Sequence, residues 1–243
     1  MSVRLLVTRP QPDAERTATA LRAQAHTVTI APLLRIETIA DAELGAGRWA
    51  AILVTSANAA AAIVIHPRLG ELKALPVWAV GRRSAEAMTD IGFANVTSAD
   101  GDVHDLAALV GARTKSTAPF LYLAGEERSG DLARTLRAMG FAVETATLYR
   151  AIAADTLPAA ATAALADGID GVLHFSRRSA AAYAAAARAS AALEAALAPI
   201  HFCLSEQAAE PLRRAGAADG VVRIADRPTE TSLLALIGAA RSD

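Results

Sequence analysis

The chain has 243 residues, 53% of them hydrophobic and only 4% aromatic, with 24 Lys and Arg against 25 Asp and Glu. This length suits two small domains, and the balanced charge gives no indication of a nucleic-acid or membrane-surface partner. Cys203 is the only cysteine, which excludes an internal disulfide framework and a thiolate metal cluster. The N-terminus begins directly with a strand-like run and has no signal-peptide pattern, so we expect a soluble, cytosolic protein.

Short runs rich in Val, Ile and Leu alternate with helical stretches along the chain. The runs lie at residues 4–7, 27–30, 50–54, 76–80, 94–97, 120–124, 142–149, 171–175, 200–204 and 220–224. Most are continuously apolar, which is typical of parallel strands buried on both faces. Helices are expected at 13–25, 82–91, 129–139 and 206–215. Gly92, Gly140 and Gly216 follow three of them at the position that favours glycine. The predicted class is α/β, with parallel sheets flanked by helices.

An internal duplication divides the chain into two similar lobes. Three pairs of segments resemble one another: 170–186 and 49–65, 199–224 and 76–98, and 4–28 and 120–143. If the first strand joins the C-terminal strands, one lobe is discontinuous (1–36 plus 150–243) and the other is an inserted lobe (37–149). The chain then crosses between the lobes near 33–40 and 144–153. The two extended crossings can pair as a two-stranded linker, which would place Tyr149 between the lobes and facing the cleft.

Small polar clusters follow the strands, where helices begin. In an open parallel sheet, ligands bind beyond the carboxyl ends of the strands, and helix N-termini there present unpaired N–H groups. Two such edges would line a cleft for a large, multiply anionic ligand, with guanidinium groups as carboxylate partners. The candidate binding residues are Arg9, Ser56, Asn58, Gly81, Arg82, Arg83, Ser84, Gly125, Arg128, Ser176, Arg177, Arg178, Ser179, Ser205 and Gln207.

A simpler interpretation of the same residues stays open. Taken singly, Ser56, Ser84, Ser176 and Ser205 are more typical of helix N-caps than of ligand contacts. Each arginine alone is typical of a solvated helix face. The repetition of the pattern in both lobes is what favours an anion-binding cleft.

Common catalytic signatures are missing from the sequence. It contains no P-loop, no nucleophile elbow, no CxxC pair and no dinucleotide-binding glycine fingerprint. The five histidines are scattered, and His174 and His201 fall within strands, which is more typical of core residues than of metal ligands. We therefore predict no metal site and chemistry dominated by binding and orientation. Tyr149 is the candidate catalytic residue, because a neutral phenol can donate a hydrogen bond to a leaving oxygen.

Several segments together resemble uroporphyrinogen-III synthase. They are LLVTRP, ILVTSANAA, WAVGRRSAEAMTDIGF, LYLAGEERSGDLARTLRAMGFAVETATLY, LHFSRRSA and PTETSLLALI, in this order over almost the whole chain. The resemblance implies two α/β lobes on a two-stranded linker and a cofactor-free lyase of tetrapyrrole (heme) biosynthesis. In this family, linear hydroxymethylbilane loses water through an azafulvene, ring D is inverted through a spirocyclic intermediate, and the macrocycle closes to uroporphyrinogen III.

The resemblance also implies roles for particular residues. The tyrosine of the second crossing, proposed to help the hydroxyl leave, corresponds to Tyr149, and the serine or threonine after the VG pair corresponds to Ser84. The chain departs from the family at Ser205, Gln207 and Ala208, where glycine and threonines are usual. It departs again at the SRRS turn, whose two arginines can bind a carboxylate instead. We expect a monomer that binds hydroxymethylbilane, no nucleic acid and no membrane, with at most a transient contact with the preceding enzyme of the pathway.

Two other functions stay open. Because a fold does not determine function, the same scaffold would suit a non-catalytic bilobal binding or regulatory module, an alternative favoured by the departure at Ser205. The third is a small α/β transferase for a phosphorylated substrate, although the sequence contains no phosphate-binding loop.

Overall fold

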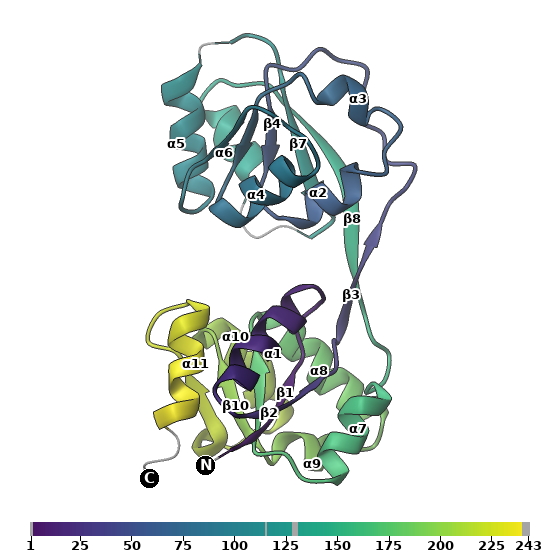
Figure 1. Cartoon of the computed structure of the whole chain (residues 1–243), viewed down its shortest axis with the longest axis vertical. Helices are drawn as coiled ribbons and strands as arrows, with labels where there is room; N and C mark the ends of the chain where they lie inside the picture. Colours follow the sequence, from purple (N-terminus) through teal and green to yellow (C-terminus); the bar gives the residue numbers. More distant parts are fainter. Residues whose placement is uncertain (1, 115, 128–130, 240–243) are drawn as a thin grey trace. The chain divides into compact units, whose positions relative to one another are not determined.

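The chain forms two compact units. The structure, a computed structural model, describes residues 2–114, 116–127 and 131–239. Unit 1 comprises Met1–Arg35 and Ile152–Asp243, and unit 2 comprises Ile36–Ala151 (Figure 1). The sequence predicts divisions at 36/37 and 149/150.

Unit 1 is a parallel sheet with the strand order β11-β10-β9-β1-β2 and helices on both faces (Figure 1). Its strands are β1 (Arg4–Val7), β2 (Thr27–Ile30), β9 (Gly171–His174), β10 (Ile200–Cys203) and β11 (Val222–Ile224). Its helices are α1 (Asp13–Ala23), α7 (Ala159–Ala166), α8 (Arg177–Ala189), α9 (Leu193–Leu197), α10 (Glu206–Ala215) and α11 (Glu230–Ala239), with a 3₁₀ turn at Asp219–Val221.

Successive residues of the unit 1 strands face opposite helical layers. Leu5 and Val7 of β1 pack in a cluster with α1 and α11, whereas Leu6 packs in the cluster that contains α7, α8, α9 and α10. Both faces of the sheet are therefore buried, so most positions of the central strands carry apolar side chains. This is the physical reason for the continuous apolar runs in the sequence.

Unit 2 is built in the same way, with the strand order β8-β7-β4-β5-β6 and β3 added beside β8. Its strands are β3 (Leu34–Thr38), β4 (Ile52–Val54), β5 (Val77–Ala79), β6 (Val96–Ser98), β7 (Phe120–Gly125) and β8 (Val143–Ala153). Its helices are α2 (Asn58–Ile63), α3 (Leu69–Leu72), α4 (Arg82–Asp90), α5 (Val103–Arg113) and α6 (Leu132–Ala138). Helices α2, α3 and α4 cover one face of the sheet, and α5 and α6 cover the other.

The two sheets have the same topology. The order β8-β7-β4-β5-β6 of unit 2 corresponds to β2-β1-β9-β10-β11 of unit 1. This is the correspondence of segments that the internal duplication predicted: β4 with β9, β5 and β6 with β10 and β11, and β7 and β8 with β1 and β2. The α/β class with two similar, helix-flanked sheets is thus confirmed.

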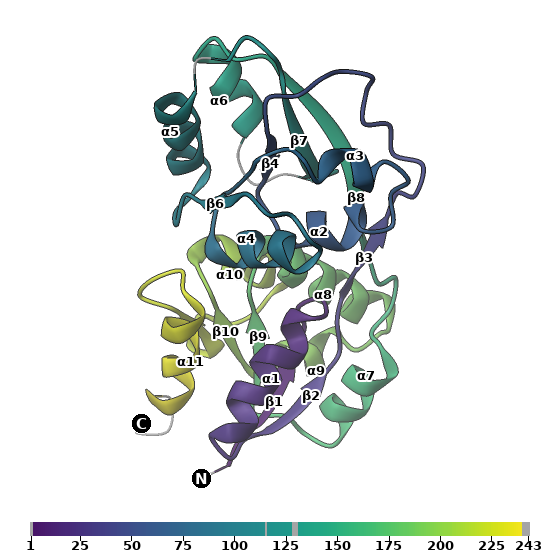
Figure 2. The same cartoon turned by 45° about the horizontal axis from the view of Figure 1, so that its top comes forward.

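Strands β3 and β8 carry the chain across the boundary between the units, and they pair with each other (Figure 2). Two backbone hydrogen bonds bracket the pair: Ile39 N to Leu148 O at 2.8 Å and Ala154 N to Leu33 O at 2.9 Å. This register is antiparallel, and it places Glu37 opposite Arg150, whose Nε donates to Glu37 Oε1 at 3.0 Å. The paired crossing expected from the sequence is therefore present.

Helix ends follow the local signals in the sequence. Gly92, Gly140 and Gly216 have positive φ values of 94°, 89° and 108°, which an L side chain adopts only with strain. Asp102 caps α5, since its carboxylate accepts from His104 N at 2.7 Å and from Asp105 N at 3.2 Å. The helix expected at 129–139 begins at Leu132 in the described part of the chain.

His174 and His201 lie in the core of unit 1, as predicted. Both are fully buried on adjacent strands, with His174 Nε2 at 3.1 Å from His201 Nδ1. Tyr183 packs against both rings and donates its hydroxyl to Ala196 O at 2.9 Å. Burial lowers the pKa of His201 to about 4, and burial together with the neighbouring His201 lowers the pKa of His174 well below its usual value. Both imidazoles are therefore neutral at neutral pH.

Two further features bear on the classes of site considered above. Among the described residues, no group of three or more His, Cys, Asp or Glu is placed to hold a metal ion. Within the same residues, none of the helices has both the length and the apolar character needed to cross a bilayer.

Candidate functional site

The carboxyl edge of the unit 2 sheet brings three of the predicted site residues together. Strands β4, β7 and β8 are parallel neighbours, so residues that follow β4 lie beside the ends of the other two. Ser56 follows β4, Gly125 ends β7, and Tyr149 of β8 is the register partner of Gly125 after an irregularity in the pairing. The cluster formed by Ser56, Gly125 and Tyr149 is the candidate catalytic site.

Tyr149 is held against the backbone of β7. Its carbonyl accepts from Glu126 N at 2.8 Å, and its side chain belongs to the core cluster of unit 2 with 9% of its surface exposed. A Cβ atom on Gly125 would lie 2.7 Å from Tyr149 Cε2 and 3.0 Å from Cζ. The ring therefore lies directly on Gly125, and only glycine leaves room for it. Tyr149 packs within unit 2, before the chain crosses at Ala151, which is a more buried position than the sequence indicated.

The surroundings of Tyr149 keep its phenol protonated. Burial is the main cause that raises its pKa above the ordinary value, and the nearby Tyr122 adds to this. Hydrogen bonds from the Ser56 hydroxyl and the Gly125 backbone N–H act in the opposite direction, because they favour the phenolate. Both groups favour the negative charge that the phenol carries once its proton is given away.

A second hydroxyl pair adjoins this cluster. Thr55 Oγ1 lies 2.9 Å from the hydroxyl of Tyr122, a β7 residue that is 2% exposed. Neither residue was among the sequence candidates. A signal for Tyr122 existed, because a tyrosine inside an otherwise apolar buried strand needs a polar partner for its hydroxyl. The identity of that partner is set by the neighbouring strand.

The loop after β5 forms the adjoining part of the same edge. Gly81 is extended and precedes α4, and Ser84 lies buried in the first turn of that helix instead of capping it. Arg82 Nε lies 3.3 Å from Asp100 Oδ1, with 81% of the arginine side chain exposed. The hydroxyl of Ser98 and then Arg82 lower the pKa of Asp100 by hydrogen bonding. Arg83 is also exposed.

Of the four serines considered as helix N-caps, two cap a helix and two do not. Ser176 caps α8 and Ser205 caps α10, accepting from Ser179 N at 3.1 Å and from Ala208 N at 3.4 Å. The N-cap interpretation is wrong for Ser84, which is the third residue of α4. It is also wrong for Ser56, which precedes the cap position of α2 and accepts from Asn58 N at 3.2 Å.

The remaining unit 1 candidates lie at the start of α8 and α10. Arg177 Nε lies 3.0 Å from Glu210 Oε2, and the arginine side chain is 62% exposed. Arg178 is half-buried, Ser179 is buried and Gln207 is exposed. Arg128 lies outside the described residues.

Arg9 contacts the protein's own acidic groups. Its guanidinium lies 3.0 Å from Asp13 Oδ2 and 3.3 Å from Glu230 Oε1, and it stacks 4.0 Å above the ring of Phe175. Only 14% of the side chain is exposed. Arg9 thereby joins β1, α1 and α11, so a ligand carboxylate at this position would compete with Asp13 and Glu230.

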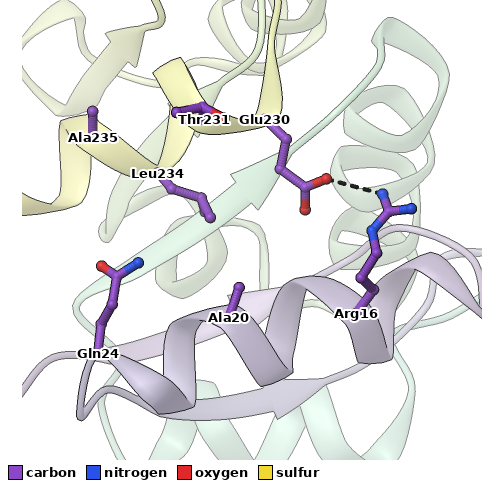
Figure 3. A pocket seen from close by; sticks show the side chains of 7 residues that line it. All are labelled: Arg16, Ala20, Gln24, Glu230, Thr231, Leu234 and Ala235. Atoms are coloured by element: carbon purple, nitrogen blue, oxygen red, sulfur yellow. Dashed lines mark hydrogen bonds and ion pairs between the residues drawn. The ribbon is translucent and has the colours of Figure 1, made fainter.

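Two surface grooves lie apart from these clusters. One, of about 550 Å³, runs between α1 and α11, where Arg16 pairs with Glu230 at 2.9 Å (Figure 3). Its other lining residues are Ala20, Gln24, Thr231, Leu234 and Ala235. The second, of about 270 Å³, lies between α8 and α10 and includes Arg177. Neither groove is lined by Tyr149, Ser56 or Gly125, so we do not place the chemistry in them.

Comparison with known proteins identifies the family. The family model for uroporphyrinogen-III synthase HemD matches residues 15–235. The solved structure of uroporphyrinogen-III synthetase from Helicobacter pylori is similar, with a TM-score of 0.69 and 19% identity, covering 99% of this chain and 100% of that one. A mutant uroporphyrinogen III synthase from Thermus thermophilus gives a TM-score of 0.56 and 16% identity, with both chains fully covered. No curated protein sequence matches the chain. At these identities the structures establish the shared fold, whereas the family model spans most of the sequence. The chain therefore belongs to the uroporphyrinogen-III synthase HemD family, whose members are hydro-lyases of tetrapyrrole biosynthesis.

Proposed function

We propose that this chain converts hydroxymethylbilane to uroporphyrinogen III and that Tyr149 is the general acid of the reaction. The proposal is carried by the buried phenol of Tyr149, whose ring lies on Gly125 and whose raised pKa keeps it protonated. Tyr149 gives its proton to the hydroxymethyl oxygen as the C–O bond breaks, and water leaves. Ring closure then releases one proton, which restores the phenol. The overall reaction thus loses one water and needs no external acid or base.

Ser56 and the backbone N–H of Gly125 act on the intermediate phenolate. Both lower the pKa of the Tyr149 phenol, which means that they favour its phenolate. Such preorganised donors stabilise a negative charge without reorganising at the moment of reaction. Burial alone would make Tyr149 a poorer acid, so these donors are what make proton donation feasible.

The proposal assigns exposed arginines at the strand ends to the acetate and propionate carboxylates of the substrate. Guanidinium groups suit this role because they bind carboxylates in a bidentate manner and stay charged. Arg82 and Arg177 are 81% and 62% exposed, and each holds one acidic partner of the protein that a substrate carboxylate can replace. The exposed Arg83 and the half-buried Arg178 are assigned to substrate carboxylates as well. We expect the chain to act as a monomer.

A product assay tests the proposed reaction. Freshly prepared hydroxymethylbilane is incubated with the protein, the products are oxidised, and the uroporphyrin isomers are separated. We expect isomer III in the presence of the protein and isomer I, the spontaneous product, in buffer alone. Isomer I alone in both reactions would contradict the enzyme assignment and would favour a non-catalytic binding module on the same scaffold.

Arg177→Ala tests the assignment of carboxylate binding. We expect KM to rise by about 3- to 10-fold with kcat unchanged, because one charge-assisted contact common to the ground state and the transition state is lost. Arg214→Ala is a matched control, since Arg214 contacts the same Glu210 from the last turn of α10 and is 73% exposed. An equal rise in KM for both variants would indicate a general charge effect instead of a binding contact.

A further inference from the structure

The hydrogen bond between Tyr122 and Thr55 lies next to the candidate catalytic cluster. Tyr122 packs in the core layer formed by α5 and α6, and its hydroxyl reaches Thr55 Oγ1 at 2.9 Å. Tyr149 belongs to the opposite layer, with α2, α3 and α4. The two tyrosines therefore approach the carboxyl edge of the sheet from opposite faces.

Thr55 and Ser56 connect the two faces. They are consecutive residues in the turn between β4 and α2, where Ser56 Oγ also accepts from Asn58 N at 3.2 Å. Thr55 is bound by Tyr122 from one side. On the other side Ser56 lies beside the hydroxyl of Tyr149 and lowers the pKa of that phenol. A shift of Thr55 must move Ser56 with it, because the two share one peptide bond and a short turn.

Unit 1 shows that the fold itself does not require this hydroxyl pair. The two sheets have the same topology, and β9 corresponds to β4. The first residue after β9 is Phe175, where the first residue after β4 is Thr55. Strand β1, the counterpart of β7, has the aliphatic residues Leu5, Leu6 and Val7 in its buried part. Unit 1 does have a buried threonine at this edge, Thr8, but its hydroxyl donates to Leu173 O at 2.8 Å. The same architecture is thus built without a tyrosine–threonine hydroxyl pair at the corresponding positions.

We propose that Tyr122, acting through Thr55, is a positioning residue of the reaction, because its hydrogen bond holds Ser56 against the phenol of Tyr149. The inference rests on the proposed role of Tyr149 as general acid. Tyr122 does not touch the reacting atoms in this scheme. Its effect on rate comes from the geometry of the donor that stabilises the phenolate.

Two substitutions, one at each partner, remove the hydrogen bond between Tyr122 and Thr55. Tyr122→Phe deletes only the hydroxyl of a buried ring, and Thr55→Val replaces the hydroxyl by a methyl group of similar size. We expect each to lower kcat by about 3- to 10-fold with KM unchanged, the range for loss of one positioning hydrogen bond. The double variant should match the single variants, since all three lack the same bond.

The same substitution in a Tyr149→Phe background separates positioning from general structural damage. There, Tyr122→Phe should have no further effect on kcat, because the group being positioned has been removed. Tyr183→Phe is the matched control: it deletes another buried phenol, bonded to Ala196 O in unit 1, and should leave kcat unchanged. Thermal unfolding of every variant reports the loss of stability separately from the loss of rate.

Each outcome decides a specific point. An unchanged kcat in Tyr122→Phe, with Tyr149→Phe impaired, would overturn the positioning role and leave the general acid in place. An equal loss of kcat on adding Tyr122→Phe to the Tyr149→Phe variant would also overturn it. A Tyr149→Phe variant with unchanged kcat would overturn the general acid, and the positioning role with it.

Discussion

We expect Tyr149→Phe to lower turnover by about 10- to 100-fold, which is below the typical contribution of a full general acid. The substitution removes the only proton that this side chain can donate and keeps the ring that lies on Gly125. KM should therefore stay within about twofold, since the phenol acts on the leaving oxygen in the transition state and not on substrate carboxylates. Steady-state kinetics with fresh hydroxymethylbilane give both parameters.

The pH dependence of turnover provides a second test of this role. The protonated phenol is the active form, and burial raises its pKa above the ordinary value. Loss of activity through this group should therefore occur only at a pH above the usual pKa of a tyrosine, about 10. A variant with wild-type kcat, or a loss of kcat matched by the control Tyr183→Phe, would remove Tyr149 from the mechanism.

Acidification destabilises unit 1 through the buried pair His174 and His201. The pKa of His201 is lowered to about 4 in the folded protein, whereas an exposed histidine titrates near 6.5. The unfolded chain thus binds more protons between these values, so stability is fully present above pH 6.5 and is lost as the pH falls to about 4. His201 alone accounts for about 3 kcal/mol over this range, at about 1.4 kcal/mol per pKa unit. His174 extends the loss further, because its pKa is lowered too.

Urea unfolding at pH 7 and pH 4.5, followed by circular dichroism, measures this loss. The matched variant replaces both imidazoles by apolar groups, His174→Phe with His201→Leu. Replacing both partners of a buried hydrogen bond is close to neutral for stability at pH 7, because neither polar group is left unpaired. We expect the variant to lose at least half of the wild-type difference between the two pH values. If its stability falls as steeply as that of the wild type, carboxylate titration is the cause and the histidine pair is not.

The fold could be predicted from the sequence because the signals that specify it are local. Continuous apolar runs such as residues 120–124 reflect strands covered on both faces, and the structure confirms that both faces of each sheet are packed. Gly92, Gly140 and Gly216 mark helix ends by their left-handed backbone, a property of the residue itself. The internal duplication is visible in the sequence, and it predicted the shared strand order of the two sheets.

The site was only partly predictable. Tyr149, Ser56 and Gly125 were all candidates, since each follows or ends a strand at the carboxyl edge. Their contact depends on β4, β7 and β8 being neighbours in register, which is a property of the sheet order. The ion pairs of Arg9 depend on tertiary structure in the same way. Its carboxylate partner Glu230 lies more than 200 residues away in sequence, on a helix that returns to the first strand only in the folded chain.

The sequence by itself therefore determined the α/β class, the two lobes, the crossings and the kind of residue at each strand end. These features depend on hydrophobic periodicity and on glycine positions, which influence the conformation of only a few neighbouring residues. Tertiary structure decided which of those residues meet. Hydrogen-bond partners such as Tyr122 and Thr55, 67 residues apart, are chosen by the order and register of the strands that carry them. The same pairing buries the Tyr149 ring on Gly125, which keeps the phenol protonated, and places Ser56 and the Gly125 N–H beside its oxygen, where they favour loss of that proton. An ordinary strand tyrosine thereby becomes the candidate acid of the reaction.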